Sequence, residues 1–356
     1  MSQFQVLQRA VNVAGMARAR APLRLGLAGG GTDVSPYADI HGGAVMNVTI
    51  DRYIYVSLAP LQGSMLELES QDLDIAIQVP VAARLPFDGR LDLHKAVYNR
   101  VVQDFLGGRR APALRISTFS EAPAGSGLGS SSTLVVAMLQ AMTEFFSLPL
   151  SEYDLAQLAF SIEREDLGLA GGRQDQYAAA FGGFNFMEFH ADNTVVVNPL
   201  RIKSAVIAEL EAQTILCFTG ISRESATIIA EQSRNVAKGE GRSVEAMHEL
   251  KASAIAMKKA LLKEDLPTVA QMLNSGWASK REMAAGISND SIERAMEVAT
   301  AAGAIAGKVS GAGGGGFIMF LAPLERRAAV LRALQEGGFR TETVRFTSEG
   351  ATSWWA

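Results

Sequence analysis

A segment rich in glycine and serine has the composition of a phosphate-binding loop. Residues 123–132 have the sequence PAGSGLGSSS, and the apolar-rich run 133–146 that follows predicts a helix. Glycines at alternate positions let backbone N–H groups turn inward, and a helix N-terminus carries partial positive charge. No lysine follows the last glycine, so the segment is not a Walker A loop. It favours triphosphate binding, and a flexible linker is the alternative interpretation.

Two further glycine-rich segments strengthen this interpretation. Residues 21–33 are APLRLGLAGGGTD, a strand before a triple glycine and an aspartate, and residues 308–317 are KVSGAGGGGF, a glycine loop before a buried strand. Ordering many glycines costs conformational entropy, so a fold keeps them mainly where backbone must approach something closely. The three segments together predict one shared site, with tight turns between packed elements as the alternative for each.

Carboxylates between residues 162 and 183 are candidates for the chemistry of phosphoryl transfer. That reaction needs a clamp on the transferred group, a metal ion, and a group that positions or deprotonates the acceptor hydroxyl. Glu163, Glu165 and Asp166 lie on a predicted helix, and Asp175 begins another helical stretch. For Asp175 the alternative is helix N-capping, and for Glu163 it is a solvated helix face.

Composition favours an enzyme of small molecules. With 356 residues, 48% of them hydrophobic, the chain is long enough for two domains or one large one. A net charge of −4 gives no electrostatic reason to expect nucleic acid or an anionic membrane as a partner. No segment approaches the roughly 18 uninterrupted apolar residues of a membrane span.

The single cysteine and the C-terminal tryptophans give weaker indications. Cys217 has no partner for an intramolecular disulfide and lies in an apolar run, which favours a buried core residue and a cytoplasmic protein. Trp354 and Trp355 are expected to dock on the body of the protein or on a second subunit, so a homodimer is left open.

The periodicity of apolar residues predicts an α+β fold. Strands are expected at residues 44–58, 66–79, 114–119, 316–321 and 341–346, and helices at 91–106, 133–146, 153–167, 222–236, 244–263, 267–283 and 291–302. Long helices dominate after residue 198. We therefore expect a domain boundary near residue 198; with the family resemblance given below, this implies an N-terminal extension at 1–16, an ATP-binding domain at 17–198 and a second domain at 199–356.

The three glycine-rich motifs, in this order along the chain, resemble those of the GHMP small-molecule kinases. The resemblance spans residues 21 to about 321. It implies a two-domain fold with the active site in the cleft between the domains, and a reaction that uses ATP and Mg²⁺. Within the family, RARAPLRLGLAGGGTD and the later FTGISR are most similar to the bacterial D-glycero-D-manno-heptose 7-phosphate kinases. Galactokinases carry a GEHTDY-like string, from which Gly30, Gly31 and Val34 depart.

The resemblance also implies roles for individual residues. ATP is expected at Pro123, Gly125, Ser126, Gly127, Leu128, Gly129, Ser130, Ser131 and Ser132. Residues 172–176 fit a GIMDQ-like string whose aspartate faces the acceptor hydroxyl, which makes Asp175 the catalytic base with Arg24 beside it. The metal is expected at Ser131 and Glu163, the glutamate at the matching distance, rather than at Glu165.

The expected substrate contacts come from several segments of the chain. The sugar is assigned to Gly30, Gly31, Thr32, Asp33, Gly182, Gly183 and Gly313, and its distal phosphate to Arg223 or Arg173. The alternative for Asp33 is a cap on the turn at 34–38, and for the arginines an ion pair.

These assignments predict a kinase that phosphorylates the anomeric hydroxyl of heptose 7-phosphate to give the 1,7-bisphosphate, in nucleotide-activated heptose biosynthesis for surface polysaccharide. A fucose- or galactose-type 1-kinase is the alternative. A sugar-binding regulator on the same scaffold should have lost Asp175 or the serines near Ser131. A nucleotide-cofactor oxidoreductase would need a strand–GxGxxG–helix unit, which is missing.

Overall fold

Two sheets with helices packed on them make up the fold. The computed structural model describes residues 15–108, 112–220, 225–237 and 241–356. The strands are β1 Ala17–Ala28, β2 Gly43–Pro60, β3 Met65–Ser70, β4 Ile75–Pro80, β5 Leu114–Ser120, β6 Phe184–Phe189, β7 Val195–Pro199, β8 Thr214–Phe218, β9 Ala306–Val309, β10 Phe317–Leu321, β11 Arg340–Glu342 and β12 Thr352–Trp355. The helices are α2 Tyr37–His41, α3 Asp92–Asp104, α4 Ser130–Phe146, α5 Glu152–Ser161, the π-helical turn η1 Ile162–Asp166, α6 Gln174–Phe181, α7 Ser204–Gln213, α8 Ser225–Ala237, α9 Gly241–Leu262, α10 Leu266–Arg281, the 3₁₀ turn η2 Ala285–Ile287, α11 Asp290–Ala302 and α12 Leu324–Glu336.

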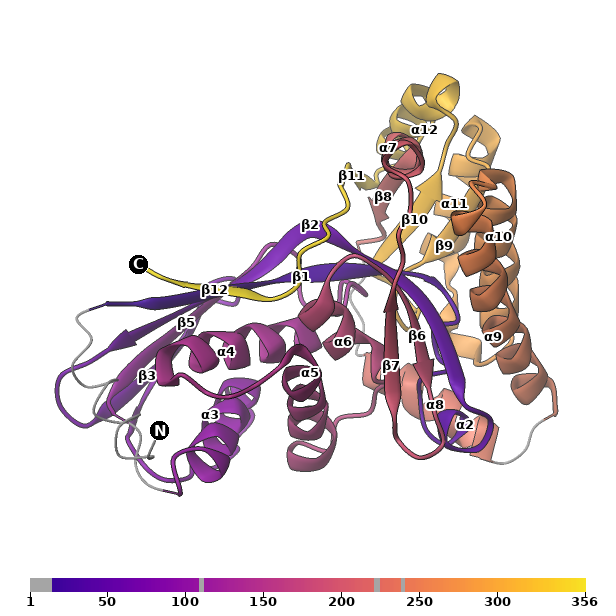
Figure 1. The fold of residues 1–356 in the computed structure, drawn as a ribbon. Helices are drawn as coiled ribbons and strands as arrows, with labels where there is room; N and C mark the ends of the chain where they lie inside the picture. Colours follow the sequence, from indigo (N-terminus) through magenta and orange to yellow (C-terminus); the bar gives the residue numbers. More distant parts are fainter. Residues whose placement is uncertain (1–14, 109–111, 221–224, 238–240) are drawn as a thin grey trace.

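The larger sheet is organised around the long strand β2. Its strand order is β12-β1-β2-β5-β3-β4, and β6 pairs with β2 and β7 outside that path. Residues 43–48 of β2 pair with β6, whereas residues 54–60 pair with β5. Figure 1 shows α3, α4 and α5 together on one side of the long strands β1 and β2.

The smaller sheet lies in the C-terminal half of the chain, with strand order β11-β8-β10-β9. Helices α7, α11 and α12 pack against its strands, while α9 contacts β1 and β2 of the larger sheet. Helix α10 contacts both β9 and β1, so it connects the two sheets (Figure 1).

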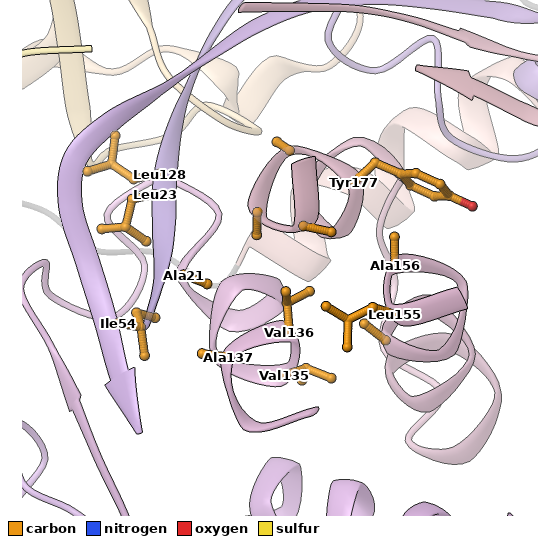
Figure 2. Close-up of a cluster of buried hydrophobic side chains, with 14 of the residues drawn as sticks. Ala21, Leu23, Ile54, Leu128, Val135, Val136, Ala137, Leu155, Ala156 and Tyr177 are labelled. Atoms are coloured by element: carbon orange, nitrogen blue, oxygen red, sulfur yellow. The ribbon is translucent and has the colours of Figure 1, made fainter. Parts of the chain in front are cut away.

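A side-chain layer between the larger sheet and α4 forms the main core. In Figure 2, Ala21 of β1 and Ile54 of β2 lie on the side of α4 that carries Ala137, whereas Val136 of α4 points toward Leu155 of α5, and all five are buried. The apolar run of α4 is nearly continuous, and eleven of its residues are buried. A helix apolar on most of its surface must be covered on most sides, which explains why α4 lies between the sheet, α3, α5 and α6.

Strand β1 contains a bulge between Pro22 and Arg24. The β1–β2 register shifts between Pro22 and Arg24, and the N–H of Arg24 donates to the carbonyl of Leu128 at 3.1 Å rather than to β2. Proline has no N–H to donate to a ladder, and bulges bend a strand and redirect its side chains. This bulge ties Arg24 to the loop before α4.

The α+β fold with two parts is confirmed, and several element boundaries differ from expectation. The helix expected at 153–167 ends at Ser161 and widens into η1. Helices α7 and α12 were not expected. Residues 1–14 of the expected extension lie outside the described residues, but Met16 pairs with Ala356. The proposed second domain therefore sends its last strand, β12, into the first sheet, where it pairs with β1. In the described part of the chain, no helix has the length and apolar character of a membrane span.

Candidate active site

The phosphate loop has the backbone that its glycines predict. Gly125, Gly127 and Gly129 adopt φ angles of 71°, 77° and 80°, a region that favours glycine. Helix α4 starts directly after the loop, and no side chain caps its N-terminus. Its first N–H groups therefore keep the partial positive charge that suits a phosphate.

The third glycine motif packs on this loop, backbone against backbone. A Cβ placed on Gly127 would lie 2.5 Å from the carbonyl oxygen of Ser310, and one on Gly311 would lie 2.7 Å from that of Gly127. The N–H of Phe317 donates to the carbonyl of Ser126 at 2.9 Å. Glycine is needed here because side chains would force the two loops apart.

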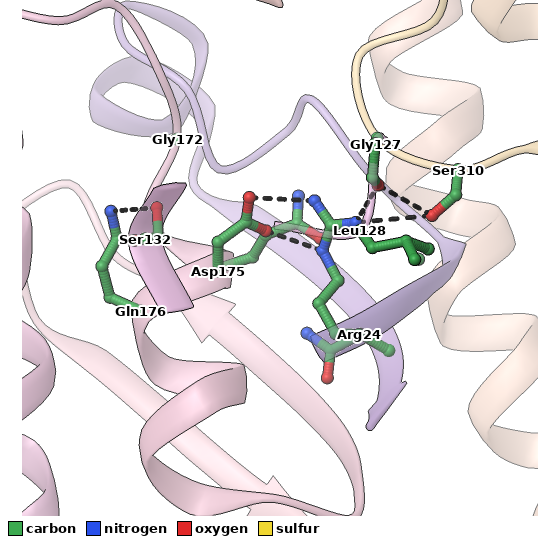
Figure 3. Close-up of polar contacts among 12 residues, drawn as sticks. Arg24, Gly127, Leu128, Ser132, Gly172, Asp175, Gln176 and Ser310 are labelled. Atoms are coloured by element: carbon green, nitrogen blue, oxygen red, sulfur yellow. Dashed lines mark hydrogen bonds and ion pairs between the residues drawn. The ribbon is translucent and has the colours of Figure 1, made fainter. Parts of the chain in front are cut away.

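Arg24 and Asp175 form an ion pair beside the loop (Figure 3). The Nε of Arg24 donates to Oδ1 of Asp175 at 2.8 Å, and its Nη2 donates to Oδ2 at 2.9 Å. The Nη1 of Arg24 donates to the carbonyl of Gly127. Because the arginine is 4% exposed and the fork is bidentate, the orientation of the carboxylate is strongly restrained.

The carboxylate of Asp33 caps α6 from a distant part of the chain. Its Oδ2 accepts from the N–H groups of Arg173 at 2.9 Å and Gln174 at 3.0 Å, and its Oδ1 accepts from the Gln174 side chain at 3.0 Å. A Cβ on Gly172 would lie 1.9 Å from Oδ2, so only glycine admits this approach. The alternative expected for Asp33, a cap on the turn at 34–38, is wrong, because Asp33 caps α6 instead. It also follows that Asp175 does not cap α6.

Glu163 is buried next to the first turn of α4. Its Oε1 accepts from the Ser131 hydroxyl at 3.2 Å, and its Oε2 accepts from the side chain of Gln176. Burial raises the pKa of this carboxyl, and the nearby Arg164 opposes the rise. The serine and the glutamate that the sequence pairs for a metal are therefore in contact.

The π-helical turn distinguishes Glu163 from its neighbour Glu165. In this turn the N–H of Leu167 donates to the carbonyl of Ile162 at 3.2 Å, five residues back. Single π turns inside helices are frequent at functional sites. The Glu163 side chain is 2% exposed, whereas that of Glu165 is 64% exposed and contacts Arg100 at 3.9 Å.

These groups surround a cavity of about 600 Å³. Its walls come from the phosphate loop, β1 and the loop after it, the 163–175 segment, α8, α10 and the β9–β10 loop. The lining residues are Arg24, Gly31, Asp33, Val34, Ala124, Gly125, Ser126, Gly127, Gly129, Ser130, Ser131, Ser132, Glu163, Arg164, Leu169, Ala170, Gly171, Gly172, Gln174, Asp175, Ile229, Gln232, Lys280, Gly311 and Ala312. A volume in this range fits a small-molecule site, and both halves of the chain contribute to it.

Two family models match two stretches of the chain that contribute to this cavity. The GHMP kinase N-terminal domain model matches residues 92–183, and the GHMP kinase C-terminal model matches residues 257–339. A D-glycero-alpha-D-manno-heptose 7-phosphate kinase of Campylobacter jejuni is 45% identical over 337 residues, which cover 95% of this chain and 98% of that protein. The chain belongs to the GHMP kinase family.

Solved structures agree with this membership. A structure described as a D-glycero-D-manno-heptose 1-phosphate kinase from Bacteroides thetaiotaomicron has 43% identity and a TM-score of 0.81, covering 95% of this chain and 98% of that one. A putative sugar kinase from C. jejuni has 44% identity and a TM-score of 0.81, covering 97% and 100%. The GHMP kinase fold and an ATP-dependent kinase activity are therefore established for this chain.

Most residues expected at the site of this GHMP kinase line the cavity. They are Arg24, Gly31, Asp33, Gly125, Ser126, Gly127, Gly129, Ser130, Ser131, Ser132, Glu163 and Asp175. Pro123, Leu128, Gly30 and Thr32 belong to the same loops without lining it. The Thr32 hydroxyl instead donates to the carbonyl of Gly29 at 2.8 Å.

Several other residues that were expected to contact the substrate do not line the cavity. Gly182 and Gly183 follow the C-terminus of α6, where a Cβ on Gly182 would lie 2.2 Å from the backbone of Glu349. A Cβ on Gly313 would lie 2.8 Å from Ile287. The guanidinium of Arg173 contacts Asn193 and lies 3.4 Å from Asp39. Arg223 lies outside the described residues.

Sequence reasoning missed four polar residues that line the cavity. Arg164 donates to the carbonyls of Leu169 and Gly172, each at 3.2 Å. Gln174 donates to Asp33. Gln232 of α8 and Lys280 of α10 come from helices whose charged and polar residues resemble a solvated surface in the sequence. Only their burial, at 5% and 3% exposed, reveals them.

Proposed function

We propose that this GHMP kinase transfers the γ-phosphoryl group of ATP to the anomeric hydroxyl of D-glycero-D-manno-heptose 7-phosphate, giving the 1,7-bisphosphate. The bidentate Arg24–Asp175 pair at the phosphate loop is the observation that carries the reaction type. The substrate comes from the C. jejuni relative named as a 7-phosphate kinase, which covers nearly the whole chain. We place the product in nucleotide-activated heptose biosynthesis for surface polysaccharide.

Asp175 is the proposed general base. The anomeric oxygen attacks the γ-phosphorus, its proton passes to the Asp175 carboxylate, and the bond from the γ-phosphorus to the β–γ bridging oxygen breaks to release ADP. Arg24 keeps that carboxylate oriented through its two hydrogen bonds. The positive charge of the Arg24 guanidinium also offsets the negative charge that develops on the phosphoryl oxygens.

The phosphate loop and the start of α4 are proposed to hold the ATP phosphates. Their glycine backbone and uncapped helix N-terminus support this role. The Ser131 hydroxyl and the Glu163 carboxylate, in contact at 3.2 Å, supply the hard oxygens that Mg²⁺ prefers. Among the described residues, this buried carboxylate has a long ion pair with Arg164, at 3.9 Å, which leaves room for a cation as a closer partner. When bound, Mg²⁺ would neutralise phosphate charge.

The sugar is proposed to lie between Gly31, Asp33 and the C-terminal wall of the cavity. Asp33 already accepts four hydrogen bonds, so it can offer a sugar hydroxyl only its remaining lone-pair capacity. Arg223 stays the proposed ligand of the distal phosphate. Arg173 is the weaker candidate because its guanidinium has protein partners, and Gly182, Gly183 and Gly313 are weaker sugar contacts because they lie outside the cavity wall.

The division into residues 17–198 and 199–356 is our proposed domain boundary. The smaller cluster of buried side chains supports it, since all its members except Tyr37 come from the second part, whereas the larger cluster crosses the boundary and includes Leu210, Met257 and Phe317. Small molecules are the proposed partners, and the cytoplasm, where ATP is supplied, is the proposed location. A homodimer remains open: Trp354 and Trp355 on the edge strand β12 are 38% and 40% exposed.

A panel of sugars assayed for ATP-dependent ADP release tests the substrate. It should include heptose 7-phosphate, heptose 1-phosphate, unphosphorylated heptose, fucose and galactose. We expect the highest kcat/KM for heptose 7-phosphate. A clear preference for heptose 1-phosphate would support the activity named for the B. thetaiotaomicron structure, and a preference for fucose or galactose would replace the heptose assignment.

A further inference from the structure

Lys280 is a buried lysine in the wall of the active-site cavity. It lies in the last turn of α10, is 3% exposed, and lines the cavity. Its Nζ donates one hydrogen bond, to the carbonyl of Gly311 at 2.6 Å. An ammonium has three donors. Among the described residues the Nζ of Lys280 has no other hydrogen bond and no ion pair within 4 Å, so two of its donors remain for a ligand.

The charges near Lys280 include more cations than the nearby carboxylates balance. Arg24 and the buried Lys308 repel it, while Asp33 and Asp175 attract it. Asp175 is already paired with Arg24, and Asp33 is held by the start of α6. Burial, with the repulsion from Arg24, lowers the pKa of Lys280 to about 8. An uncompensated cation in such a place is costly unless an anion joins it.

The contact with Gly311 places the ammonium at the phosphate end of the cavity. Gly311 packs directly on Gly127 of the phosphate loop, and the carbonyl of Gly127 accepts from Arg24. A Cβ on Gly30, in the loop after β1, would lie 3.8 Å from the Lys280 Nζ. The lysine thus stands between the phosphate loop and the loop proposed for the sugar, where donor and acceptor must meet.

We propose that Lys280 is a catalytic residue whose ammonium contacts the phosphoryl group as it passes from ATP to the acceptor oxygen. This inference rests on the proposed phosphoryl transfer from ATP but not on the identity of the sugar. Lys280 forms no covalent bond and moves no proton. Asp175 takes the acceptor proton and ADP leaves with the bridging oxygen, while Lys280 donates hydrogen bonds to the non-bridging oxygens of the γ-phosphoryl group.

Nucleotide binding tests this contact without any sugar. Calorimetry should compare the affinities of the β,γ-imido analogue of ATP and of ADP, with Mg²⁺, for wild type, Lys280→Met and Lys280→Arg. Loss of a charge-assisted hydrogen bond should reduce the preference for the triphosphate by about 10- to 100-fold in Lys280→Met. Lys280→Arg keeps the charge and should retain part of the preference. If Lys280→Met does not fold, the triphosphate preference of Lys280→Arg, compared with that of wild type, tests the contact.

Arg281→Met is the matched control, because Arg281 is the next residue and pairs with Glu293 at the surface. It should keep the wild-type preference. A second arm compares binding of heptose 7-phosphate and unphosphorylated heptose to the same variants. The proposal is overturned if Lys280→Met keeps the triphosphate preference, whether or not it loses the preference for the phosphorylated sugar. Failure of wild type to bind any heptose would remove the substrate assignment and leave the nucleotide result to decide on Lys280.

Discussion

Arg24 and Asp175 stand 151 positions apart in the chain, yet they face each other through two parallel hydrogen bonds of 2.8 and 2.9 Å. Each end of this contact is fixed by its own element. A bulge in β1 turns Arg24 toward the phosphate loop, and the cap that Asp33 places on α6 sets the first turn that carries Asp175. The pair thus joins the phosphate loop, the loop after β1 and α6 in one arrangement.

Asp175→Asn keeps the shape of the side chain and removes the proton acceptor. Turnover should fall by roughly a hundredfold or more, while nucleotide affinity stays near wild type. Steady-state kinetics and calorimetry on the same preparation measure both quantities. Near-normal turnover in this variant would make the pair with Arg24 a structural ion pair.

The metal assignment predicts different behaviour for two glutamates in the same turn. Glu163→Gln removes an anionic oxygen beside Ser131, so the Mg²⁺ concentration for half-maximal activity should rise by roughly 10- to 100-fold, the scale of losses around metal ligands. Glu165→Gln is the control, because that side chain is 64% exposed. If Glu165→Gln is the defective variant, the metal assignment is wrong.

The contact between the two glycine loops predicts a steric effect on ATP binding. Gly127→Ala places a Cβ 2.5 Å from the Ser310 carbonyl oxygen at a φ of +77°, so ATP affinity and thermal stability should both fall. Gly89→Ala is matched in φ, at +83°, but has open space around it. It should cost only the strain of a left-handed residue, about 1–2 kcal/mol, and leave ATP affinity unchanged. Equal ATP affinities for the two variants would contradict the packing argument.

The lysine in the cavity wall predicts an alkaline limit to activity. Burial and, to a smaller extent, repulsion from Arg24 lower the pKa of Lys280 from 10.5 to about 8, against the opposing attraction of Asp33 and Asp175. Lys308 also faces it, and burial lowers the pKa of Lys308 well below its ordinary value. Only the protonated form can donate to a phosphoryl oxygen and carry charge, so kcat/KM should decline as pH rises through about 8.

Lys280→Arg provides the comparison for this pH dependence. A guanidinium stays protonated across the whole range, so the decline near pH 8 should disappear even if the absolute rate is lower. A pH profile of kcat/KM for wild type and variant is sufficient. The same decline in both proteins would assign the ionisation to another group.

The sequence predicts best what local composition determines. Alternate glycines followed by an apolar run specified both the conformation of the phosphate loop and the start of α4, because backbone freedom and helix periodicity are local properties. The pairing of Arg24 with Asp175 came from the family resemblance, since no local pattern links residues so far apart. Glu163 and Glu165 could be distinguished in the same way, whereas the physical cause, a π turn, was not visible in the sequence.

What the sequence did not reveal depends on tertiary packing. Lys280 stands beside Arg281 and Glu282, a run typical of a solvated helix end, and becomes buried only because α10 packs against both β1 and β9. The short strand β12 finds its partner β1 more than 300 residues earlier in the chain, at a pairing of Ala17 with Trp355. Arg173 was expected to bind a phosphate, but its partners Asn193 and Asp39 come from other segments of the fold.

Phosphorus NMR of the reaction product tests the central claim most directly. Wild-type protein is incubated with ATP, Mg²⁺ and D-glycero-D-manno-heptose 7-phosphate, and Asp175→Asn is treated in parallel. The account predicts a new resonance coupled to the anomeric proton, with the 7-phosphate resonance retained, and its near absence with Asp175→Asn. A new phosphate on any other carbon, or ADP formation with no sugar bisphosphate, would contradict it.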